Sequence, residues 1–220
     1  MVASYEQVRA PDDAQISAVQ GVQSGASELA SITLETIAIK GRAPSNNYDR
    51  SNFGAGWASV AGCDTRNRIL ERDLEDVVVR DDGCVVVSGK LNDPYTAKQV
   101  LFTRGDGTSN AVQIDHVVAL SDAWQKGAAN LGADTREQFA NDPLNLLAVD
   151  GPTNIKKSDS DAASWLPPNK SFRCRYVARQ ISVKSKYGLW VTRAEHDVME
   201  RVLNTCPGQV LPVVVARNAP

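Results

Sequence analysis

The chain of 220 residues is poor in histidine, in net charge and in long apolar segments. It contains only two histidines, His116 and His196, and its formal net charge is −2. A small negative charge argues against binding of nucleic acid by overall charge, so any phosphate-binding surface has to be a local patch. No segment approaches the roughly 20 apolar residues of a membrane span. We therefore expect no membrane association.

The four cysteines lack the close C-x₂-C spacing of metal sites. An even number without such spacing favours two disulfides and an oxidising, extracytoplasmic setting. Three connectivities are possible; we favour Cys63 with Cys84 and Cys174 with Cys206, and four buried thiols are the alternative. The start of the chain lacks the basic and apolar regions of a secretory signal. If the cysteines form disulfides, we expect that a signal has been removed.

Hydrophobic period and turn residues predict an α+β fold, in which helices surround a small antiparallel sheet. The predicted strands are 77–80, 84–88, 99–103, 111–118 and 145–149. The predicted helices are 28–39, 63–74, 121–130, 135–140, a short one after Gly151-Pro152, 171–186 and 192–204, the last opened by the capping box Thr192-Arg-Ala-Glu195. His196, in the first turn of that helix and outside any motif, is expected to be a surface histidine.

We expect a single domain over residues 29–206. Residues 1–28 have no convincing period and are predicted to be a flexible tail. Residues 207–220 are predicted to be a second tail, apolar enough to lie on the domain or on a partner.

Most side chains that could bind a metal ion or act in catalysis lie in the stretch from Ile114 to Pro168. Asp115 and Asn154 offer hard oxygen ligands of the kind that suit Mg²⁺. His116 follows Asp115 directly, and a neutral imidazole can accept a proton from an attacking water. A metal ion, a base and nearby lysines together suit the hydrolysis of a phosphodiester.

The order of these residues resembles the ββα-metal motif of the HNH endonucleases. The resemblance rests on Asp115-His116, on Asn145-Leu146 in a second strand, and on Asn154-x-x-Lys157-Ser-Asp159 in a helix. Flanking segments are similar to a branch of secreted bacterial HNH nucleases with an Asp-His-Val core, namely 115–124, 139–143, 165–168 and 174–176. The likeness extends from about residue 41 to residue 206, with the ββα-metal core at about 111–165.

The resemblance implies a role for each motif residue. His116 would be the general base, and Asp115 and Asn154 would hold a single Mg²⁺, with Mn²⁺ as a substitute. Asn145 would hold the base or the two-strand scaffold in place, and Lys157 would lie near the scissile phosphate. A second histidine is common where this chain has Asn154. Because neighbours on a strand point to opposite faces, we expect regular pairing to break at Asp115.

Further cations form a candidate phosphate-binding patch. Arg66 is predicted to contact the substrate or its transition state, since a fixed guanidinium can hold two phosphate oxygens. Lys156, Arg68 and Arg173 are predicted to bind substrate. A structural ion pair at Arg66 and solvated helix faces for the others are the alternatives.

These observations predict a secreted, metal-dependent endonuclease that cleaves DNA, or alternatively RNA, with little sequence specificity. No obligate protein partner is evident. Two rivals stay open: a catalytically silent secreted module that binds nucleic acid or a surface, and a structure-selective nuclease that depends on a partner.

Overall fold

The computed structural model describes residues 28–212 and confirms the α+β class. The helices are α1 (Ala30–Thr36), α2 (Thr65–Asp73), α3 (Leu120–Gln125), α4 (Ala133–Asn141), α5 (Gly151–Lys157), α6 (Arg173–Lys186) and α7 (Arg193–Leu203). The strands are β1 (Ser59–Val60), β2 (Cys63–Asp64), β3 (Leu74–Val79), β4 (Val86–Asn92), β5 (Gln99–Thr103), β6 (Val112–His116) and β7 (Leu146–Asp150). Short 3₁₀ turns include η1 (Arg50–Phe53).

Local sequence signals explain where several helices begin and end. The Asp64 carboxylate accepts the Asn67 N–H and caps α2. Thr192 and Glu195 form the predicted capping box of α7. After α6, Gly188 adopts a φ of +62°, a conformation that glycine reaches without strain. No helix between residues 28 and 212 is long and apolar enough to cross a membrane.

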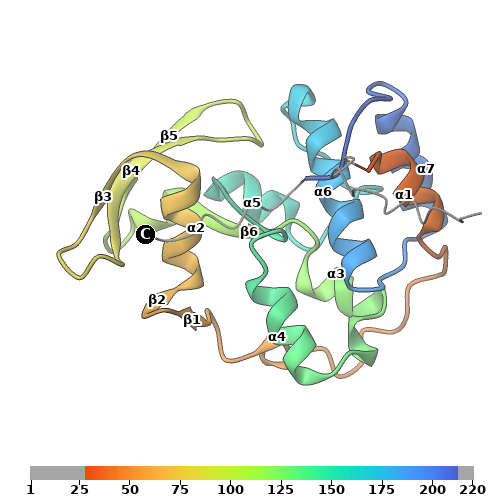
Figure 1. Ribbon diagram of the computed structural model, residues 1–220, viewed down its shortest axis with the longest axis horizontal. Coiled ribbons are helices and arrows are strands. Elements are labelled where there is room, and N and C mark those ends of the chain that lie inside the picture. Colours follow the sequence, from red (N-terminus) through yellow and green to blue (C-terminus); the bar gives the residue numbers. More distant parts are fainter. Residues whose placement is uncertain (1–27, 213–220) are drawn as a thin grey trace, which may run out of the picture.

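The strands form three separate antiparallel sheets, β1-β2, β3-β4-β5 and β6-β7, rather than the single sheet that we predicted. The reason lies in α2, whose Ile69 and Leu70 share one apolar cluster with residues of the three-stranded sheet and of the β6-β7 ribbon. This helix contacts both sheets, so they are connected by side-chain packing on α2 rather than by hydrogen bonds between strands. Figure 1 shows β6 and α5 near the middle of the molecule, with β3-β5 at one end and α1, α6 and α7 at the other.

The β6-β7 ribbon is buried on both faces. Leu147 and Val149 belong to the apolar cluster around α6, whereas Leu146 and Ala148 belong to the cluster around α2. This division follows from the alternation of side chains along a strand. The pairing stays regular through Asp115↔Leu147 and His116↔Leu146, so the predicted break at Asp115 is wrong.

The two favoured disulfides are confirmed. Cys63–Cys84 joins β2 to the segment before β4, and Cys174–Cys206 joins α6 to the end of α7. Nearly all of the predicted tail 1–28 lies outside the described residues. Of the predicted tail 207–220, the described part lies against the start of α1, where Val210 pairs with Leu29.

A buried ionic network connects α3, α6, α7 and the turn that contains Asp161. Lys126 Nζ lies 2.7 Å from Asp161 Oδ2 and 2.6 Å from Glu195 Oε2, and it is fully buried. Lys184 Nζ lies 3.0 Å from Glu195 Oε1, and Arg42 lies 2.7 Å from Asp161. Burial alone would raise the pKa of Asp161, but the cations outweigh it and lower that pKa to about 2.

The network predicts a large cost for removing one charge. Asp161→Asn should lower the free energy of unfolding by about 3–5 kcal/mol at pH 7, because Lys126 would lose a buried partner. Since the folded-state pKa lies below the unfolded value, the contribution is complete above about pH 4 and is lost as the pH falls toward 2. Urea unfolding at pH 7, 5 and 3 measures both effects.

Asp76→Asn is the matched control, because Asp76 pairs with Lys90 at the surface. Its cost should stay below about 1 kcal/mol. Equal costs for the two variants would contradict a special role for the buried network.

Candidate active site

The end of β6 lies in the wall of a cavity of about 480 Å³. A second hollow of about 340 Å³ adjoins it, because Arg50, His116 and Leu120 line both. The polar residues of the first cavity that matter here come from η1, α2, β6 and α5. They are Arg50, Arg66, Gln113, Asp115, His116 and Asn154.

His116 is held on two sides. Its ring stacks on Trp57, with centroids 5.7 Å apart and planes inclined by 7°. Its Nε2 lies 2.9 Å from the backbone oxygen of Ala140. A carbonyl oxygen only accepts hydrogen bonds, so Nε2 carries the proton and Nδ1 keeps its lone pair in the neutral ring.

The surroundings keep this imidazole uncharged. Burial lowers the pKa of His116 to about 3, and the nearby charges of Arg50 and Lys157 act in the same direction, against the bond to Ala140. The ring is therefore neutral at neutral pH. A neutral imidazole with a defined acceptor nitrogen is the form that a general base requires.

Asp115 points to the other face of β6. Its Oδ1 lies 2.9 Å from Lys157 Nζ, and its Oδ2 accepts the hydroxyl of Tyr95. Burial raises the pKa of Asp115, and Lys157 and Tyr95 oppose that rise. Lys157 is fully buried and also donates to the backbone oxygen of His116, 2.9 Å away. The lysine that was predicted to lie near phosphate thus contacts the carboxylate and the backbone of the Asp-His pair.

Asn154 presents an amide oxygen at the same cavity. Its Nδ2 donates to Gln113 Oε1 over 2.9 Å, which leaves its Oδ1 without a hydrogen-bond partner among residues 28–212. One carboxylate and one amide oxygen fit Mg²⁺, which keeps several waters and takes few protein ligands. The described part of this cavity has no group of three closely spaced His, Cys, Asp or Glu side chains. The donor set therefore suits a largely hydrated ion that shares Asp115 with Lys157.

Asn145 holds the chain directly after His116 and approaches the segment that contacts the imidazole ring. Its Oδ1 accepts the Val118 N–H at 2.9 Å, and its Nδ2 donates to the Val118 oxygen at 3.2 Å. Its backbone oxygen accepts the Val117 N–H. The same Nδ2 lies 3.5 Å from the oxygen of Phe139, next to the residue that binds His116. Asn145 is thus placed to position the base, and it is itself fully buried.

Two guanidinium groups line the cavity without a carboxylate partner among residues 28–212. Arg66 is half-buried above the ring of Phe102, and burial together with the charge of Arg104 lowers its pKa. Arg50 lies at the start of η1, and it lines both hollows. Cations that no carboxylate neutralises favour an anionic ligand.

The remaining predicted substrate contacts lie elsewhere or are already engaged. Lys156 is exposed on α5. Arg68 donates twice to the backbone oxygen of Val60, and Arg173 donates to the oxygen of Pro167. Their predicted role in substrate binding stays a prediction.

The sequence did not single out Arg50, Trp57, Tyr95 or the Ala140 carbonyl. Arg50 and Trp57 stand in a segment of aromatic residues that is as typical of a core as of a site. A backbone carbonyl carries no sequence signal at all. Only the tertiary structure brings these groups to β6.

The position of Asn145 predicts a loss of stability. Asn145→Ala should cost about 1–3 kcal/mol, because the Val118 N–H and oxygen would be buried without partners. Asn92→Ala is the control, since Asn92 is exposed on β4. Chemical denaturation measures both, and a neutral Asn145→Ala would show that the strand end is held by other contacts.

A family model described as GmrSD restriction endonucleases, C-terminal domain, matches residues 64–202. An uncharacterized secreted protein from Arthroderma benhamiae is 39% identical over 176 residues, which cover 79% of this chain and 82% of that protein. No solved structure matches significantly. The family match includes β6, β7 and α5 and covers most of the chain. The chain therefore belongs to the family of GmrSD restriction endonuclease C-terminal domains, whose function is of nuclease type.

Proposed function

We propose that the protein is a secreted, metal-dependent endonuclease of the HNH type. It hydrolyses the phosphodiester bonds of DNA, with RNA as the alternative substrate. The observation that carries this proposal is the state of His116, a neutral ring with its proton fixed on Nε2 by Ala140. Its cavity is lined by two guanidinium groups that have no carboxylate partner among residues 28–212. Membership of a restriction endonuclease family supports it.

His116 acts as the general base. Its Nδ1 takes a proton from water while the water oxygen forms a bond to phosphorus. The bond from phosphorus to the 3′-oxygen breaks and that oxygen takes up a proton from solvent water, so the products carry a 5′-phosphate and a 3′-hydroxyl. Trp57 and the Ala140 oxygen keep the ring in one orientation, which lowers the entropic cost of reaching the reacting geometry.

Asp115 and Asn154 are the proposed ligands of Mg²⁺, which Mn²⁺ could replace. When bound, the ion supplies Lewis-acid stabilisation of the charge that develops on phosphate. Lys157 and Tyr95 fix the Asp115 carboxylate from the protein side. Lys157 thus acts on the ligand rather than on the substrate.

Substrate is held by its phosphates. Arg50 and Arg66 can each hold two phosphate oxygens, and Lys156, Arg68 and Arg173 are proposed as contacts farther along the strand. Contacts to the backbone carry no sequence information, so cleavage should be largely independent of sequence.

Secretion is proposed from two observations. The chain has two disulfides, which persist in oxidising compartments. The similar protein from Arthroderma benhamiae is named as secreted.

The central test is cleavage of supercoiled plasmid by purified protein. Wild type should nick the plasmid with Mg²⁺ and lose this activity in EDTA. His116→Ala should lower the rate by about 10²- to 10⁴-fold, because the water loses its proton acceptor. Added imidazole should restore part of the lost rate, a rescue that a merely structural defect would not show.

Circular dichroism and thermal unfolding show whether His116→Ala is folded. A folded variant that cleaves within a few-fold of wild type would refute the role of His116. If folded wild type cleaves nothing with any metal, the silent binding module or the partner-dependent nuclease becomes the better explanation.

The two guanidinium groups give a separate prediction. Arg50→Gln and Arg66→Gln should each lower kcat/KM about 10- to 100-fold at low salt, through the loss of a charged hydrogen bond. Each should also reduce the slope of log kcat/KM against log salt by about 0.9 on duplex DNA. Arg80→Gln, at the exposed turn after β3, is the control for loss of one positive charge. Equal slopes for all four proteins would argue against phosphate contacts at Arg50 and Arg66.

A further inference from the structure

His196 is buried, which contradicts its prediction as a surface histidine. Its exposed fraction is 6%, because α7 packs against α1 and α6. Within residues 28–212, its Nδ1 is shielded from solvent and has no hydrogen-bond partner. A buried ring nitrogen without a partner is unfavourable and calls for an explanation.

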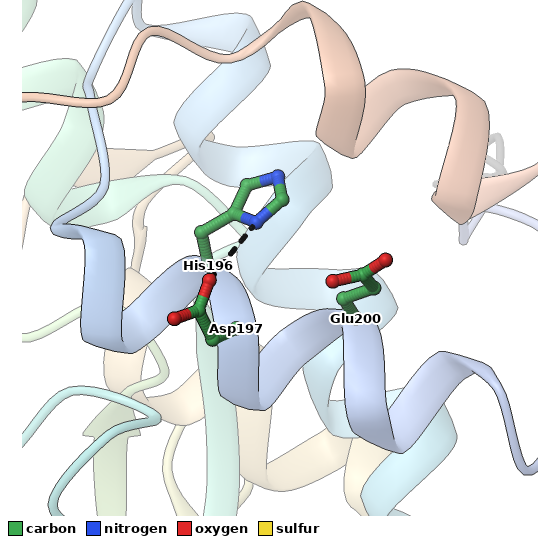
Figure 2. A group of neighbouring side chains, drawn as sticks. All are labelled: His196, Asp197 and Glu200. Atoms are coloured by element: carbon green, nitrogen blue, oxygen red, sulfur yellow. Dashed lines mark ion pairs between the residues drawn. The ribbon is translucent and has the colours of Figure 1, made fainter.

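Two carboxylates stand beside this nitrogen on the same helix. Asp197 Oδ1 lies 3.8 Å from His196 Nδ1. One ligand atom from each of His196, Asp197 and Glu200 lies within 4.8 Å of the others. Figure 2 shows the ring above α7, with both acids on the side of the ring that carries Nδ1. The two acids are exposed, so their side chains can adjust.

We propose that His196, Asp197 and Glu200 bind a zinc ion, with Nδ1 as the nitrogen ligand. Imidazole with carboxylates suits Zn²⁺, whereas Mg²⁺ and Ca²⁺ prefer oxygen ligands alone. Tetrahedral bonds of about 2.0–2.2 Å place the ligand atoms of one zinc ion about 3.4 Å apart. The 3.8 Å between His196 Nδ1 and Asp197 Oδ1 is close to that value, and all three ligand atoms lie within 4.8 Å of one another, so the exposed acids would have to rotate toward the ion. Water fills the fourth position.

Glu35 of α1 completes the arrangement from the other side of the ring. Its Oε1 lies 3.8 Å from His196 Nε2. A histidine that binds metal commonly directs its second nitrogen to a carboxylate, which fixes the tautomer and makes the ligand more basic. A proton on Nε2 would leave the Nδ1 lone pair for the ion.

The local charge favours a divalent cation. Three carboxylates, those of Glu35, Asp197 and Glu200, lie around the ring of His196. Among residues 28–212, the cation paired with them is Arg193, whose Nη1 lies 3.9 Å from Asp197 Oδ1 at the surface. Such an exposed pair is weak and leaves most of the negative charge uncompensated.

The ion would have a structural role. It would link the first half of α7 to α1 through Glu35, whereas Cys174–Cys206 joins the segment after α7 to α6. The site belongs to α7 and α1, whereas the cavity of His116 is built from η1, α2, β6 and α5. The proposal is therefore independent of the proposed nuclease activity.

The experiment is calorimetric titration of ZnCl₂ into the full disulfide-bonded chain after treatment with EDTA, with thermal unfolding as the second readout. Wild type should bind one zinc ion per chain and unfold at a higher temperature when zinc is present. The double variant Asp197→Asn/Glu200→Gln should lose this site and the thermal shift. Glu35→Gln should weaken zinc binding about 10- to 100-fold.

Two control proteins make the result specific. Glu75→Gln/Asp81→Asn removes the same charge from exposed acids outside the site and should bind zinc like wild type. His116→Ala removes the other histidine of the chain and should also retain the ion.

Three binding results would overturn the proposal. They are no zinc binding by wild type, undiminished binding by the Asp197→Asn/Glu200→Gln variant, and binding that disappears in His116→Ala instead. Equal thermal shifts with Mg²⁺ and Zn²⁺ would also overturn it, because they would indicate an acidic surface without a nitrogen ligand.

Discussion

The alternation of side chains along β6 is the constraint on which the candidate site depends. Asp115 and His116 are adjacent, and regular pairing to β7 sends them to opposite faces. Each therefore acquires its own set of partners, Lys157 and Tyr95 for the acid, Trp57 and Ala140 for the histidine. Both residues line the cavity at the end of the strand. Because the two side chains lie on opposite faces of the strand, Asp115 contacts the cation Lys157 while the ring of His116 stays neutral.

A strand end can serve as such a site only if the chain that follows is fixed. Asn145 binds the backbone of Val118, and α3 begins directly after it. Asp122 on α3 then enters the buried ionic network through Lys126 and Lys184. An intact buried ion pair adds little net stability, but removing one partner is costly because it leaves a buried charge without compensation. Such a network therefore favours one arrangement of the helices over others. Through this network, α6 and α7 fix the position of α3, which follows the strand end at the wall of the cavity.

Features set by local chemistry could be predicted from the sequence, and features set by packing could not. The cap at Asp64, the capping box at Thr192 and the two ribbon strands depend on residues a few positions apart. The position of α2 between two sheets depends on contacts between segments that are distant in the sequence. Hydrophobic periodicity predicts a strand but not the sheet to which it belongs. Burial of Lys157 and His196 was missed for the same reason. The segments that bury these two residues are distant in the sequence, the strand that carries Asp115 for Lys157 and the helices α1 and α6 for His196.

The charges that favour phosphate also act on the base. Arg50 lowers the pKa of His116, and its charge would be largely balanced once a phosphate lies beside it. If the cations alone kept the ring neutral, binding of substrate would encourage its protonation and remove the acceptor when it is needed. Burial is the larger cause, however, and it does not depend on the substrate's charge. Burial beside Trp57 thus keeps the His116 ring neutral when substrate binds, so that Nδ1 can take the proton from water.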